Sequence, residues 1–100
     1  MDNILSPKDL QLLVAGRLRA ARLAANLTQQ SLSLRAGISL GSLKRFEGAG
    51  EISLKGMVRL AFALRMESDV AELFRARQKA SMDELLELTK KPQRKRGRKS

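Results

Sequence analysis

The side chains best suited to specific chemistry lie between residues 39 and 48, in the stretch SLGSLKRFEG. Arg45 carries a planar guanidinium group, which can donate two parallel hydrogen bonds to O6 and N7 of a guanine base. Lys44 can donate to a base edge or to a phosphate. These side chains would stand at the exposed start of a helix. We therefore predict that this helix reads DNA bases through four residues: Leu40, Gly41, Lys44 and Arg45.

Two short predicted helices would position this stretch. Thr28 can cap the first helix, because its hydroxyl accepts a hydrogen bond from a free backbone N–H group. Gly37 can end that helix in the left-handed conformation, which glycine adopts without strain. Ser39 can then cap the second helix, which we expect to run to about residue 48. Two short helices joined by a glycine-containing turn are typical of a helix-turn-helix motif.

Further helices are predicted on both sides of this motif. Ser6 caps a helix that should run to about residue 25, with Asn26 as its left-handed exit. Ser53 caps a helix that ends near residue 66, and Ser68 caps a last one reaching about residue 78. Apolar residues that recur at spacings of three and four predict the inward faces of the first two: Leu10, Leu13, Val14, Leu18 and Ala21, and then Leu54, Met57, Val58, Ala61 and Leu64.

Composition supports an all-α fold. The chain has 100 residues, 43% of them hydrophobic, with three Phe and no Trp or Tyr. No run of strand length alternates apolar with polar residues, as a β-strand would. We expect a compact bundle of about five helices, a short C-terminal helix and a disordered basic tail. The expected boundaries are a flexible N-terminus over 1–6, a helix-turn-helix domain over 7–78, a short helix or linker over 79–89 and the tail over 90–100.

The absence of two residue types excludes much catalytic chemistry. Without Cys and His, the chain cannot build a zinc site from those ligands, a Cys–His pair or a Ser–His–Asp triad. We therefore expect no enzyme activity, no metal and no other cofactor. No apolar run is long enough to cross a membrane, and no signal peptide pattern opens the chain. We expect a cytoplasmic, nucleoid-associated bacterial protein with no membrane contact.

The formal net charge of +10 is concentrated in the tail, KKPQRKRGRKS. Such a run can bind phosphates without sequence preference, enter a minor groove as a hook, or bind a protein partner. These alternatives stay open at the level of sequence. The residues concerned are Lys90, Lys91, Arg94, Lys95, Arg96, Arg98 and Lys99.

Five segments in register resemble the lambda-repressor and Cro-like (XRE) family of helix-turn-helix regulators. The resemblance covers about residues 14–66. It implies an ion pair between Arg22 and Glu47, and that the glycine-containing loop expected over residues 48–52 runs along the DNA backbone. The segments are LRAAR at 18–22, LTQ at 27–29, AGIS at 36–39, LKRFEG at 43–48 and SLKGMVRLAFAL at 53–64.

Residues that contact phosphate are expected around the reading helix. The resemblance implies that Gln29 holds a phosphate and supports the reading helix, although ordinary capping is the alternative for Gln29 and Ser42. For Arg17 and Arg19, the alternative is a solvated basic face. The full set of expected phosphate contacts is Gln29, Ser39, Ser42, Arg17, Arg19 and Lys55.

Some positions depart from the family pattern. Leu40 and Gly41 stand where many relatives carry polar base readers, so hydrogen-bonded readout would fall to Arg45 and Lys44, assisted by DNA shape. Leu34 and Phe62 are also apolar where relatives tend to be polar. Phe62, Val70 and Phe74 form either a homodimer seam or, for the last two, a face buried within one subunit.

The size, the domain and a downstream SMDELLEL segment also resemble HipB-like antitoxins, which are encoded beside HipA-type kinase toxins. This resemblance implies a homodimer that binds a palindromic double-stranded operator, represses its own operon, and binds a HipA-type kinase toxin or an associated small protein. Two other functions stay open. One is a stand-alone repressor of phage or restriction-control type, and the other is a protein-interaction adaptor.

Overall fold

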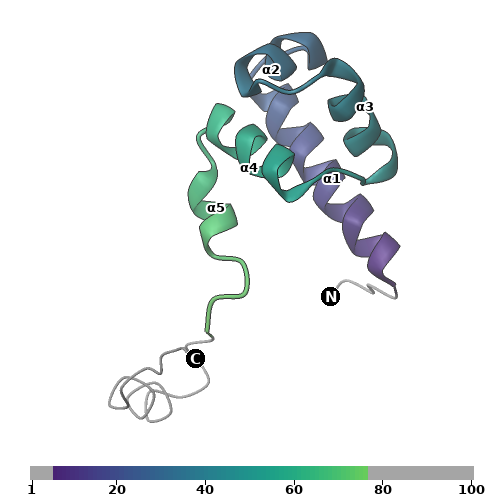
Figure 1. The fold of residues 1–100 in the computed structure, drawn as a ribbon, viewed down its shortest axis with the longest axis vertical. Helices are drawn as coiled ribbons and strands as arrows, with labels where there is room; N and C mark the ends of the chain where they lie inside the picture. Colours follow the sequence, from purple (N-terminus) through teal and green to yellow (C-terminus); the bar gives the residue numbers. More distant parts are fainter. Residues whose placement is uncertain (1–5, 77–100) are drawn as a thin grey trace.

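The computed structural model describes residues 6–76, which form five helices and no strand (Figure 1). The prediction of an all-α bundle is therefore confirmed for this part of the chain. No helix of the described residues is long and apolar enough to cross a membrane. Residues 1–5, the short helix expected within 79–89 and the basic tail lie outside the described residues. The helices are α1 (Pro7–Ala24), α2 (Gln29–Ala36), α3 (Leu40–Ala49), α4 (Leu54–Ala63) and α5 (Glu67–Ala71).

The first four helices begin where hydroxyl side chains can cap them. The Oγ atoms of Ser6, Ser39 and Ser53 and the Oγ1 atom of Thr28 each accept a hydrogen bond from the backbone N–H three residues ahead. The donor–acceptor distances are 3.0–3.1 Å. Each bond satisfies one backbone group that the helix itself leaves free. Local sequence thus fixes the starts of α1 to α4.

The connections after α1, α2 and α3 each pass through a left-handed residue. Asn26 has φ of 59° and Gly37 has φ of 73°, as predicted for the two exits. Gly50 has φ of 75° and caps the end of α3. The loop expected over residues 48–52 therefore begins later than predicted, because Gly48 and Ala49 still belong to the helix. The close approach of Gly50 is to α1, where an added Cβ would lie 2.9 Å from Cβ of Gln11.

The core lies where α1, α2, α3 and α4 meet. Leu32, Leu43 and Leu60 are fully buried, and Ala15 and Phe46 are nearly so. The predicted inward faces of α1 and α4 are partly wrong, because Leu10 and Leu54 are 47% and 66% exposed. Both lie in the first turn of a helix. The predicted faces also omitted Ala15 and Leu60, which are the most deeply buried apolar residues of the two helices.

The last helix differs most from expectation. It covers only Glu67–Ala71, and its N-cap, Met66, makes no side-chain capping bond, so Ser68 is not the cap. The chain enters it through Arg65 in the left-handed conformation. Phe74 lies beyond the helix with φ of 59° and is fully exposed, so it is not folded back into the core.

Candidate nucleic-acid interface

The first turns of α3 form a surface of small and cationic residues. Gly41, Ser42, Lys44 and Arg45 are exposed, whereas Leu40 is half-buried. An added Cβ at Gly41 would meet nothing closer than the Oγ atom of Ser39 at 4.0 Å. A ligand could therefore approach the backbone of α3 at this point.

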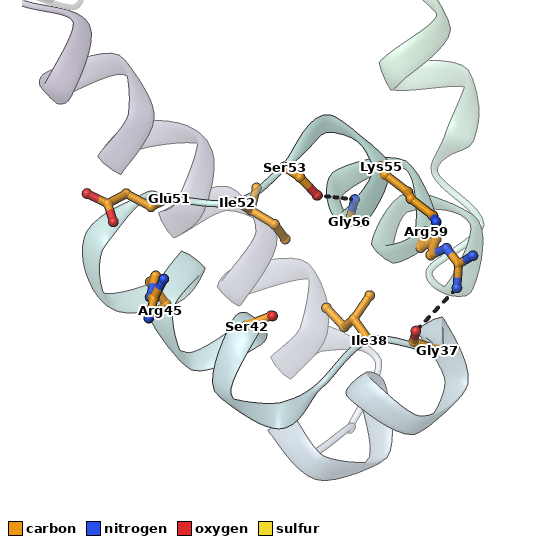
Figure 2. Close-up of a pocket in the computed structure, with 10 residues that line it drawn as sticks. All are labelled: Gly37, Ile38, Ser42, Arg45, Glu51, Ile52, Ser53, Lys55, Gly56 and Arg59. Carbon is orange, nitrogen blue, oxygen red and sulfur yellow. Dashed lines mark hydrogen bonds between the residues drawn. The ribbon is translucent and has the colours of Figure 1, made fainter.

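A groove of about 480 Å³ lies beside this surface, between α3 and α4 (Figure 2). Three cationic side chains line it, namely Arg45 from α3 and Lys55 and Arg59 from α4. Ser42 and Ser53 add hydroxyl groups. The single carboxylate among the lining residues is that of Glu51, in the loop between the two helices. This balance of charge suits an anionic ligand such as a phosphate chain.

Arg59 also holds the turn before α3. Its Nη1 atom donates a hydrogen bond of 3.2 Å to the carbonyl oxygen of Gly37, as the dashed line in Figure 2 shows. Because Gly37 is 22 residues away in the chain, no local pattern indicates this link.

The opposite side of α3 is fixed by Arg22 and Glu47, which the family resemblance paired. Arg22 donates from Nε to Glu47 Oε2 at 2.7 Å and from Nη2 to Oε1 at 2.9 Å. The two side chains are only 8% and 4% exposed. The pKa of Arg22 is raised above its ordinary value, mainly by the hydrogen bond with Glu47. Burial lowers this pKa, and the charge of the Glu47 carboxylate raises it further. The guanidinium also donates to the Leu27 carbonyl at 2.9 Å, so α1 is tied to the start of α2 as well.

Gln29 takes part in the same network. Its Nε2 atom donates to Glu47 Oε1 at 3.0 Å. This contact gives Gln29 the supporting position that the resemblance implied. Gln29 does not line the groove between α3 and α4.

The end of α3 is held by the beginning of α1. Lys8 donates from Nζ to the carbonyl oxygen of Ala49, and Gln11 donates from Nε2 to that of Gly50 at 2.9 Å. The Nζ atom of Lys8 also lies 3.9 Å from Oε2 of Glu51. A cation at the carboxyl end of a helix is favoured by the helix dipole. No local pattern in the sequence indicates these two contacts, because they span 41 and 39 residues.

The remaining predicted site residues are dispersed. Ser39 caps α3, and Arg19 is exposed on α1 outside the groove. Arg17 lines a different, apolar groove together with residues of α5. Phe62 is 62% exposed, and Val70 is half-buried in that same apolar groove. The basic residues of the tail lie outside the described range.

The polar groups on the surface of α3 and in the groove beside it are therefore mainly cations and hydroxyl groups. Within residues 6–76, no three side chains of the Asp, Glu, His or Cys types gather to hold a metal ion. Neither the models of known protein families nor the curated proteins give a match to this chain. Its function has to be argued from the surface of α3 and the groove beside it.

Proposed function

We propose that this protein is a sequence-specific DNA-binding transcriptional repressor of the lambda-repressor and Cro-like type. The observation that supports this best is the exposed, cationic start of α3 beside a groove lined by Arg45, Lys55 and Arg59. The major groove of DNA is about 12 Å wide and admits one helix. With α3 in the major groove, the cations that line the neighbouring groove of the protein would lie close to DNA phosphates.

The residues of α3 then divide by chemistry. Arg45 is the main base reader, since its guanidinium can bond two acceptors of guanine. Lys44 reads a base or a phosphate. Leu40 contacts a thymine methyl group at most, and Gly41 permits the backbone to come close. Ser42 and Lys55 contact phosphate from the groove that they line.

We further propose a regulatory setting. A homodimer would bind a palindromic operator whose half-sites lie one turn, about 34 Å, apart. The operator would be that of its own operon, and a HipA-type kinase toxin or an associated small protein would be the partner, as in HipBA-like systems. A stand-alone repressor of phage or restriction-control type is the alternative. Co-purification of a kinase-like neighbour with the full chain would distinguish the two.

The test is binding of a labelled duplex from the gene's upstream region, with a scrambled duplex as control. Arg45→Ala should weaken binding to the upstream duplex by about 1–3 kcal/mol, roughly 5- to 150-fold, with little effect on the scrambled one. Arg75→Ala removes another exposed Arg, outside the residues that line the groove, and should change neither. Equal binding of both duplexes by the unaltered chain would sink the proposal.

A second candidate is a protein-interaction adaptor. It is favoured by Leu34 and Phe62, which are 75% and 62% exposed and leave apolar side chains on the surface of α2 and α4. For an adaptor, Arg45→Ala would leave any DNA binding unchanged and would keep the partner in a pull-down. Leu34→Ser with Phe62→Ser would release the partner.

A further inference from the structure

A second groove of about 470 Å³ is apolar. It is lined by Val14 and Leu18 of α1, Met57 of α4, Leu64 at the C-cap of α4, and Leu73, which follows α5. Phe46 of α3 reaches it from the core. Figure 1 shows α5 beside the end of α4. Leu73 is 51% exposed here. A continuous apolar hollow on a small soluble domain usually marks an interaction surface.

The chain itself supplies a fitting occupant. Beyond the last described residue lies the segment 81–88, SMDELLEL, in which Ser81 and Glu84 have capping-box spacing. Met82, Leu85 and Leu86 follow the i, i+3, i+4 spacing that places side chains on one face of a helix. A helix this short is not stable alone and needs an apolar surface to cover that face.

The length of the connection permits docking within one chain. The groove is lined up to Leu73, and only residues 77–80 separate the described part of the chain from the segment. Four extended residues span about 13 Å. A short tether keeps the segment at an effective concentration in the millimolar range, which favours it over a separate molecule.

The charged residues of the segment set its orientation. Glu84 and Glu87 lie on the side of such a helix opposite its apolar face. Docking of the apolar face therefore keeps them away from the acidic side chains Asp69 and Glu72, which line the groove together with Arg17. The basic run that follows has no apolar side chain and cannot fill the hollow.

We propose that segment 81–88 docks as a short amphipathic helix in the apolar groove of its own chain. Its leucines cover the hollow and contact the core beside Phe46. The basic run that starts at residue 90 is then anchored to the domain. This inference does not depend on DNA binding, and its test contains no DNA.

The chain has no Cys, so introduced cysteines can be cross-linked without interference. Arg17→Cys and, as a matched control, Arg19→Cys are each combined with Asp83→Cys or Leu88→Cys, which lie at the two edges of the apolar face of the segment, in the full chain. Arg17 and Arg19 are both exposed on α1, but only Arg17 lines the groove. Under mild oxidation, a disulfide within one chain should form at least about tenfold faster from position 17 than from position 19.

A third variant tests whether docking causes the cross-link. Leu85→Asp with Leu86→Asp, added to the position-17 pair, should reduce the rate to that of the control, while circular dichroism shows that the domain remains helical. Equal rates of disulfide formation from positions 17 and 19 would overturn the proposal. A rate from position 17 that the two aspartates leave unchanged would also overturn it. Disulfides that join two chains would show that a second copy occupies the groove instead.

Discussion

Replacing Glu47 by Leu should destabilise the protein severely, although Leu is a good core residue. Arg22 and Glu47 are almost completely buried, and the carboxylate accepts two bonds from Arg22 and one from Gln29. Without it, the guanidinium keeps the Leu27 carbonyl as its hydrogen-bond partner but loses its counter-charge. Breaking a buried pair in this way costs about 3–5 kcal/mol. For a domain of this size that lowers the melting temperature by roughly 12 °C or more.

The double variant Arg22→Met with Glu47→Leu removes both charges. It leaves the Leu27 carbonyl and the Gln29 amide without these partners, at about 1–3 kcal/mol for a buried orphan group. We therefore expect the double variant to be more stable than Glu47→Leu alone. Thermal and urea unfolding followed by circular dichroism would measure Glu47→Leu, Arg22→Met and the double variant against the unaltered protein. If the two single losses simply add in the double variant, the argument from burial is refuted.

Two further measurements bound this prediction. Glu72→Ala removes the exposed pair with Arg75, whose side chains are 60% and 54% exposed, and should cost less than about 1 kcal/mol. The raised pKa of Arg22 means that its contribution to stability is complete below the pKa in the unfolded chain and is lost only at higher pH. No unfolding step caused by Arg22 should therefore appear across the neutral range.

Three smaller changes test the two ends of α3 and the start of α4. Gly50→Ala should destabilise by at least about 1 kcal/mol, because φ is positive and the new Cβ would lie 3.0 Å from the carbonyl carbon of Gln11. Gly41→Ala, in the same helix but with open space around it, should stabilise or be neutral, and a loss equal to that of Gly50→Ala would contradict the reasoning. Ser53→Ala removes the cap of α4 and should cost about 0.5–2 kcal/mol in a thermal melt, whereas an unchanged melt would show that this bond contributes nothing.

The features that could be predicted from sequence are those that depend on neighbours in the chain. Ser6, Thr28, Ser39 and Ser53 cap their helices through bonds that reach only three residues, so residue type and position were sufficient. Gly37 likewise ended α2 as expected. The same local reasoning failed at Ser68, because the N-cap of α5 is Met66, two residues earlier, and it follows a left-handed Arg65 that no composition rule indicates.

The features that could not be predicted depend on which segments meet. The contacts from Arg59 to Gly37 and from Lys8 to Ala49 join residues 22 and 41 positions apart. The loop that contains Gly50 was expected to run along DNA, but Gly50 itself packs closely against Gln11 of α1. The apolar groove was also missed. It combines residues of α1, α3, α4 and α5 that are individually ordinary in their own helices.

The ties around α3 have a consequence for the thermodynamics of association. Arg59 holds the turn before the helix, the Arg22–Glu47 pair holds its buried side, and Lys8 and Gln11 hold its end. The helix is therefore already rigid in the free protein, and a ligand need not immobilise it on arrival. Calorimetry should give a heat-capacity change that reflects only the surface covered at the contact, without the large negative contribution that accompanies folding on binding.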